Sequence, residues 1–359
     1  MRYPNVQVLR VAAAVGVVIH HTGAHGVAVL GVPKDELSFL LARVIVGFPV
    51  PLFFAVSGFV LTLAVRAAPG GYSARQFLLA RFLRLFPGYW LAVALALALS
   101  AAGLLSATHR ELVPFVNVGT ITLWPNGGRS PLFLGVEWSL VYEVFLSVAL
   151  CGLAVFGRWL AVAVVCWLAV LGVKSIIAPG YGTDVLPHWT TIGLSGFVVP
   201  FLLGVLTAHL KDRGSRVAAV VVVALVGWCL TTGAMRFHTV DAVWWNWGVA
   251  AAGTVWLAVR LPQVSPEHRL ARLGDATYGL FLIHVPVMLA MMYAFARTGV
   301  LAGRVEGALI AGAIALAVGF AFGRAECGLY ARVRPIGKWS AADFRAKLMR
   351  RPPRPARAS

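Results

Sequence analysis

The chain has 359 residues, of which 60% are hydrophobic and only 12% are charged. Soluble domains carry about 25% charged residues, so this composition excludes a soluble fold, and it also excludes disorder, collagen and a coiled coil. A net charge of +18 would suggest nucleic-acid binding in a soluble protein. Here the basic residues lie between apolar runs and in a tail, so they indicate membrane topology, and we expect no nucleic-acid partner. The sequence predicts an all-α, polytopic integral membrane protein.

Ten apolar segments are long enough, or nearly so, to cross the membrane as helices. The loops between them hold 23 Lys and Arg residues on one side and 6 on the other, which places both termini in the cytoplasm. We expect a membrane domain over residues 1–335 and a basic, Pro-rich, disordered cytoplasmic tail over residues 336–359. The ten expected spans are 11–30, 40–65, 86–105, 132–156, 159–178, 190–210, 217–233, 242–259, 276–296 and 305–323.

The first span contains an arginine and several histidines. Arg10 and His21 are eleven residues apart, which is about three full helical turns, so both side chains lie on one helix face. His25 shares that face, whereas His20 points elsewhere. The rise of about 16 Å places Arg10 at the inner surface and His21 near mid-membrane. A histidine there is a candidate proton acceptor, and its alternative role is interhelical hydrogen bonding.

The second span and the segment after it carry further polar residues. Ser57 and Gly58 favour close helix packing or the lining of a site over nucleophilic catalysis. Arg81 and Arg84 are neighbours on a helix face just before Pro87. Arginines at a cytoplasmic helix end bind phosphates through bidentate hydrogen bonds, and their alternative role is positive-inside anchoring.

The fourth span reads VEWSLVYEVF. Ser139 and Glu143 are four residues apart and share a helix face, and so do Trp138 and Tyr142. A carboxylate inside a membrane needs a basic partner from another helix, so we expect Glu143 to be paired in a site.

The ninth span contains Tyr278 and, about a turn and a half later, His284 before Pro286. The segment WWNW at 244–247 stands at an outer boundary, where it is typical of an interfacial aromatic belt or of sugar stacking. His21 and His25 are four residues apart, but no third ligand is evident, so we expect no metal site.

These motifs together resemble the bacterial membrane acyltransferase-3 family over residues 5–335. The opening VQVLR is similar to the exopolysaccharide-modifying branch. The positions that carry the family resemblance are Arg10 and His21, the stretch FFAVSGF at 53–59, the basic set Arg81, Arg84 and Pro87, the set Trp138, Ser139, Leu140 and Glu143, and the late set Tyr278, Leu282, His284 and Pro286.

The resemblance implies a ten-helix protein of the bacterial inner membrane that transfers an acyl group, usually acetyl, from an acyl-CoA co-substrate. The acceptor would be a hydroxyl of a carbohydrate or glycolipid of the cell envelope, with no permanently bound cofactor. Arg10, Arg81 and Arg84 would hold the donor's phosphates. His21 would act as general base or as acyl carrier, and Glu143 would orient it. The site would be lined by His25, Ser57, Trp138, Ser139, Tyr142, Tyr278 and His284.

Two other functions fit the same composition. A transporter or flippase for an acylated sugar or lipid would use the buried histidine and glutamate as a proton relay. A membrane scaffold would recruit partners through its basic tail.

Overall fold

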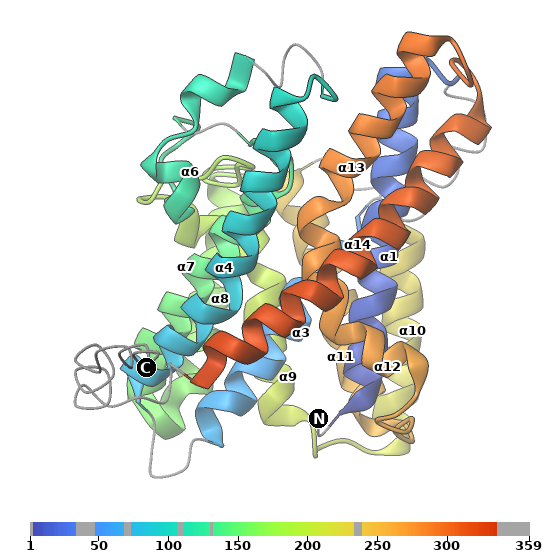
Figure 1. Ribbon diagram of the computed structural model, residues 1–359. Coiled ribbons are helices and arrows are strands. Elements are labelled where there is room, and N and C mark those ends of the chain that lie inside the picture. The colour runs from blue at the N-terminus through green and yellow to red at the C-terminus, as the bar shows by residue number, and fades with distance from the viewer. Residues whose placement is uncertain are drawn as a thin grey trace, which may run out of the picture.

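Figure 1 shows the computed structural model, which describes residues 3–33, 47–67, 73–105, 111–129, 132–232 and 239–335. Within these ranges the chain forms helices, turns and loops but no strand, and Asn126 and His188 form an isolated bridge. The expected all-α class is therefore confirmed for the described residues. Residues 40–46 of the second expected span and the expected tail, 336–359, lie outside them.

Each expected span has a helix in the described part of the chain. These helices are α1 (Pro4–Leu30), α3 (Pro49–Arg66), α4 (Ala74–Ala101), α7 (Glu137–Leu153), α8 (Leu160–Ile177), α9 (Val199–Leu210), α10 (Arg216–Thr232), α11 (Val240–Arg260), α13 (Thr277–Thr298) and α14 (Val305–Val333). Short helices and single turns connect them: η1 (Val113–Phe115), α6 (Val118–Thr122), η2 (Ala154–Trp159), η3 (Ile192–Leu194), η4 (Gly196–Val198), α12 (Arg269–Leu273) and η5 (Gly274–Ala276).

Six of the described helical stretches are long and apolar enough to cross a membrane, with Glu137–Ile177 counted as one. Helices α9 and α10 are apolar but shorter. The chain is thus a multi-pass membrane protein, while the number ten stays a prediction. Several helices extend beyond the expected spans: α4, for example, begins at a Ser73 cap and passes through Pro87.

The stretch Glu137–Ile177 folds back on itself between α7 and α8. Gly157 has φ 53° and ψ −114°, which interrupts the helical path, and a residue without a side chain adopts this conformation most readily. The rings of Phe145 and Trp167 then meet with centroids 6.3 Å apart. Since these residues are almost equally far from the turn, α7 and α8 are antiparallel neighbours, as Figure 1 shows.

Glycines allow two pairs of helices to approach closely. A methyl group at Gly58 of α3 would lie 2.1 Å from the carbonyl oxygen of Phe201 on α9, and one at Gly204 would lie 2.1 Å from that of Ala55. Gly279 of α13 faces Gly323 of α14 in the same way. Small residues at such crossings bring backbones into van der Waals contact, which is a main source of helix association in membranes.

The start of α1 and the end of α14 lie toward the same end of the bundle, at the bottom of Figure 1. At this end, called the terminal end below, Asn5 donates hydrogen bonds to the carbonyls of Ala258 and Pro262. At the opposite end, called the far end, the Gly303 amide donates to the carbonyl of Leu30. This arrangement agrees with an even number of crossings between the two termini.

Candidate active site

A cavity of about 750 Å³ opens between α1, α3, α4, α7, α13 and α14. Its volume lies within the usual range of pockets that bind small molecules. Seven of the residues singled out from the sequence line it, and they come from five of these helices: Arg10, Ser57, Arg81, Arg84, Ser139, Glu143 and Tyr278.

Arg81 and Glu143 form an ion pair on the cavity wall. The hydroxyl of Ser57 donates to Oε1 of Glu143 at 3.1 Å. Arg81 also donates through Nε to Oγ of Ser147 at 3.3 Å. The carboxylate therefore fixes the guanidinium and the serine in one geometry, which is the expected buried pairing of Glu143 with a basic side chain.

Arg84 forms a separate ion pair with Glu326, which is only 2% exposed. Its guanidinium also lies over two tyrosine rings, 4.9 Å from the centroid of Tyr278 and 5.1 Å from that of Tyr330. Such a guanidinium is held by charge and by cation–π attraction together. Arg84 is thus largely committed to partners within the protein.

Arg10 has a different environment. Its guanidinium donates to Oε1 of Gln7 at 3.0 Å, and Nε2 of Gln7 donates to Asp275 at 2.6 Å. Arg10 and Arg334 both line the cavity, and neither forms an ion pair with a described carboxylate. Their positive charges are the ones available to an anion in the cavity.

Four histidines gather beside this cavity. The ring centroid of His21 lies 5.1 Å from that of His20, 5.4 Å from the stacked ring of His25 and 5.2 Å from that of His284. The contact between His21 and His25 agrees with the shared helix face. The described residues contain no group of three or more His, Cys, Asp or Glu arranged to hold a metal ion.

His284 is fully buried in α13, and its Nδ1 lies 2.7 Å from the carbonyl oxygen of Phe281. A carbonyl only accepts hydrogen bonds, so Nδ1 carries the hydrogen and Nε2 of the neutral ring has a free lone pair. Nε2 has no hydrogen-bond partner among the described residues. His284 thus presents an unused acceptor within the histidine cluster.

Phe281 connects the cavity to the histidines. It lines the cavity, and its ring centroid lies 5.9 Å from those of Phe53 and His284. Phe281 and His284 are three residues apart on α13, so the histidines begin about 4.5 Å further along that helix. A group that contacts Phe281 inside the cavity is therefore separated from His284 by about the thickness of the Phe281 ring.

Glu143, which the family resemblance implies would orient His21, pairs with other residues in the structure. Its polar partners are Arg81 and Ser57, and no hydrogen bond or ion pair joins it to His21. Two helices from different parts of the fold carry Glu143 and His21, and one sequence does not reveal which basic residue faces the carboxylate. Beside His21 the structure places His284 instead.

Trp138 and Tyr142 lie outside the cavity lining. Tyr142 donates to the carbonyl of Asp184 at 2.8 Å and contacts Oγ of Ser195 at 3.0 Å, so it anchors the segment before α9. Trp138 packs on Phe197, with centroids 5.2 Å apart. The two aromatic residues share a face, as expected, and both rings pack against Phe197.

Residues of the segment 244–247 pack against other parts of the bundle. Trp244 packs on Phe197 at 4.3 Å between centroids, and Asn246 donates to the carbonyl of Cys229. Trp247 is only 4% exposed. These contacts tie α11 to its neighbours, and an aromatic belt or sugar stacking at 244–247 stays a prediction.

Two cavity-lining residues, Gln7 and Asp275, and the Arg84 partner Glu326 were missed by sequence reasoning. Gln7 and Asp275 lie outside the expected spans, and Glu326 follows the expected end of the last one. A single acidic residue in a segment that is expected to be a loop gives no signal of burial. Only an α14 that continues to Val333 shows that Glu326 faces Arg84.

A family model described as an acyltransferase domain matches residues 3–324, which is nearly the whole chain. No curated protein and no solved structure matches it. The match covers α1, which carries Arg10 and His21, and also the cavity-lining parts of α3, α4, α7 and α13. The chain therefore belongs to the acyltransferase-3 family and is a membrane acyltransferase.

Proposed function

We propose that this acyltransferase transfers an acyl group, acetyl in the simplest case, from acyl-CoA to a hydroxyl of a cell-envelope carbohydrate or glycoconjugate. The observation that supports it is the arginine-lined cavity directly beside a cluster of histidines. Acyl-CoA has phosphates at one end and a thioester at the end of a long, weakly polar arm. The cavity is lined by arginines and, toward the histidines, by aromatic residues. It is therefore suited to the phosphates and to the weakly polar arm of acyl-CoA.

Arg10 and Arg334 would bind the donor's phosphates, because their charges are not neutralised by a described carboxylate. Arg81 and Arg84 would contribute to the positive potential while Glu143 and Glu326 hold them in place. In this arrangement Glu143 is a positioning residue that fixes Arg81 and Ser57, as its hydrogen bonds suggest.

His21 would accept the proton of the acceptor hydroxyl as the oxygen attacks the thioester carbonyl. The carbon–oxygen bond forms, the carbon–sulfur bond breaks, and the proton passes from His21 to the departing sulfur to give free CoA. His284, held in one tautomer by the Phe281 carbonyl, would accept a hydrogen bond at Nε2 and so orient the reacting groups. His25, stacked on His21, would limit the rotation of its ring.

The proposal includes the bacterial inner membrane, ten crossings and a cytoplasmic terminal end. In a cysteine-free background, cysteines at Ser265 in the loop before α12 and at Thr190 near the far end test the orientation. We expect a membrane-impermeant maleimide to label Thr190→Cys in intact cells and Ser265→Cys only after lysis. Labelling of both from the same side would contradict the orientation and the donor's cytoplasmic approach.

The activity itself is tested by incubating the purified protein with acetyl-CoA and a cell-envelope carbohydrate acceptor, and by measuring free CoA thiol together with the acetylated acceptor. We expect thiol release that the His21→Ala variant lacks. A protein that binds acetyl-CoA and leaves the thioester intact with every acceptor supplied would exclude the proposed reaction, and would favour transport.

A further inference from the structure

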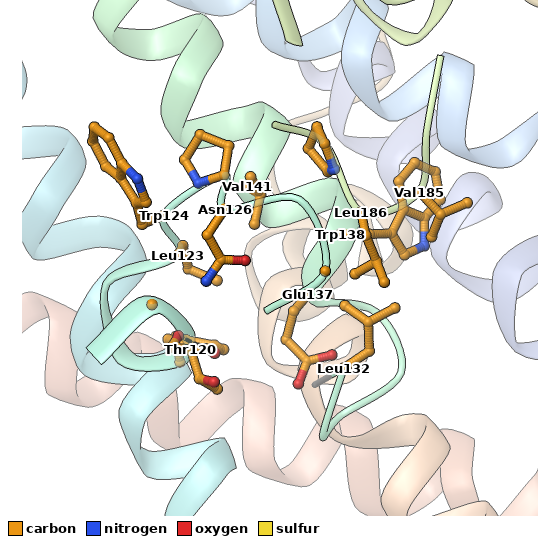
Figure 2. Close-up of a pocket in the computed structure, with 15 residues that line it drawn as sticks. Thr120, Leu123, Trp124, Asn126, Leu132, Glu137, Trp138, Val141, Val185 and Leu186 are labelled. Carbon is orange, nitrogen blue, oxygen red and sulfur yellow. Dashed lines mark hydrogen bonds between the residues drawn. The ribbon is translucent and has the colours of Figure 1, made fainter. Parts of the chain in front are cut away.

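A second, smaller pocket, with a volume of about 30 Å³, is lined by residues of α4, α6, the start of α7 and the segment 185–187 (Figure 2). It shares no lining residue with the large cavity. Its Thr120 belongs to α6, which lies in the half of the bundle away from the terminal end in Figure 1. The pocket is therefore a separate site toward the far end, and the proposed acyl transfer makes no use of it.

Glu137 is an unusual residue for the wall of such a pocket, because it is only 3% exposed. Its Oε1 accepts a hydrogen bond from the Leu134 amide, which holds the loop before α7. Its Oε2 has no hydrogen-bond partner among the described residues. A buried carboxyl oxygen without a partner is costly, and such atoms in native proteins usually serve a ligand or water. Oε2 is therefore the atom of this pocket that most needs a hydrogen-bond donor.

The charge and the size of the pocket indicate which donor fits. Buried carboxylates are normally paired with a cation. No Lys or Arg is among the described lining residues, and no ion pair joins Glu137 to a described cation. A volume of about 30 Å³ holds about two water-sized groups. A primary ammonium group has that size, whereas a trimethylammonium group is too large, so the pocket fits a primary ammonium.

The rim of the pocket is apolar. Trp124, Val185 and Leu186 line the pocket and are all exposed, Trp124 by 58%. Apolar side chains that stay exposed on a multi-pass membrane protein contact lipid, and tryptophan is enriched at the depth of the lipid headgroups. The face of a tryptophan ring also attracts cations. An ammonium group that enters past this rim therefore comes from the lipid surface.

Arg129 supplies a positive charge beside the pocket. It follows the lining residue Gly128 in the chain, it is exposed, and no ion pair joins it to a described carboxylate. An arginine in this position suits a phosphate, which it binds through charge-assisted hydrogen bonds. A headgroup that carries an ammonium and a phosphate thus matches Glu137 and Arg129 together.

We propose that this pocket binds the primary ammonium group of an aminophospholipid, such as phosphatidylethanolamine, from the leaflet at the far end. The ammonium donates to Oε2 of Glu137, the phosphate pairs with Arg129, and the rest of the lipid lies against the exposed apolar rim. The bound headgroup supplies the counter-charge that the protein itself does not give Glu137. This inference goes beyond the proposed acyl transfer and does not depend on it, because no thioester takes part.

The test uses the full-length protein in detergent and measures lipid binding by native mass spectrometry. The probes are a phosphatidylethanolamine and a phosphatidylcholine with the same acyl chains. We expect one ethanolamine lipid to bind about tenfold more tightly than the choline lipid, as a charged hydrogen bond predicts. Glu137→Gln should remove this preference, since glutamine keeps an acceptor for the Leu134 amide and loses the charge. The matched control is Glu306→Gln, an exposed carboxylate of α14, and it should leave the preference unchanged.

A second variant separates the lipid from a free amine and does not disturb a buried residue. Arg129→Ala should weaken the ethanolamine lipid about tenfold and leave the weak binding of free ethanolamine, which has no phosphate, unchanged.

Three results would contradict the proposal. Equal affinities for the two lipids, or a preference that survives Glu137→Gln, would mean that the pocket holds only water. Free ethanolamine that binds as tightly as the ethanolamine lipid, in the wild type and in Arg129→Ala alike, would overturn the lipid as the source of the ammonium.

Discussion

Two buried ion pairs in this protein have the same chemistry and different surroundings. Lys174 and Asp241 join α8 to α11 at 2.8 Å, and Asp241 is fully buried. Its two carboxylate oxygens also accept hydrogen bonds from the amide of Gly180 and the hydroxyl of Thr183. Arg81 and Glu143, by contrast, stand on the wall of the large cavity. A buried charge is tolerated where a counter-charge and hydrogen bonds surround it, as they do at Asp241.

The difference suggests separate purposes for the two pairs. The Lys174 pair leaves no room for a ligand, and it fastens the segment before α9 to the bundle through Thr183, which accepts from the Gly196 amide. The Arg81 pair keeps a cation and a carboxylate in contact with a space that a substrate can fill. The first should therefore determine stability, and the second should determine activity.

The largest effect is expected at the histidines that the cavity adjoins. His21→Ala should reduce acetyl-CoA-dependent transfer by about 10²–10⁴-fold, the usual contribution of a general base. His20→Ala should reduce it far less, because His20 points about 100° away around the helix. Transfer by each purified variant at matched protein amounts is the measurement. An inactive His20→Ala variant together with an active His21→Ala variant would contradict the assignment of His21 as the general base.

The next largest effect concerns the ion pair of Lys174 with Asp241. Asp241→Asn leaves the buried ammonium of Lys174 without a counter-charge, which should lower the stability by about 3–5 kcal/mol. The melting temperature in detergent should fall, and adding Lys174→Met should recover part of the loss. The control is Asp212→Asn, the 82% exposed partner of Lys211, where we expect less than about 1 kcal/mol. Equal melting temperatures for the Asp241→Asn and Asp212→Asn variants would mean that the Lys174–Asp241 pair does not stabilise the helix bundle.

Glu143→Gln should lower the activity more than it lowers the stability. It weakens the hold on Arg81 and Ser57, so we expect transfer to fall about 10–100-fold, equivalent to the roughly 1.5–3 kcal/mol of a charged hydrogen bond. The melting temperature should fall less than in Asp241→Asn, because Arg81 borders a cavity and can be reached by water. The two variants are compared by activity and melting curves on the same preparations. Greater loss of stability in Glu143→Gln would remove the distinction between the pairs.

The sequence predicted much of this fold and only part of the site. Apolar length and the basic loops located a helix at every expected span, since crossing a bilayer imposes a simple length requirement. The helical period also placed His21 and His25 together. The partners of Glu143 and Arg84 were not predictable, because they are set by how helices distant in the chain pack. The pairing of Lys174 with Asp241 was not predictable either, because the two residues lie 67 positions apart in the chain.

The smallest effect separates the arginines of the cavity. Arg10→Ala should weaken acetyl-CoA binding about tenfold, because its charge has no described carboxylate partner and is available to a phosphate. Arg84→Ala should weaken binding less and lower the melting temperature more, since it leaves the buried Glu326 unpaired. Arg75→Ala, an exposed residue of α4 outside the cavity lining, is the control and should change neither. Binding is measured by titration calorimetry at two salt concentrations, and the Arg10 contribution should shrink at the higher one. If Arg84→Ala has the larger effect on affinity, the ion pair of Arg84 with Glu326 opens when the donor binds, and a buried carboxylate partner does not withhold a cavity arginine from the donor.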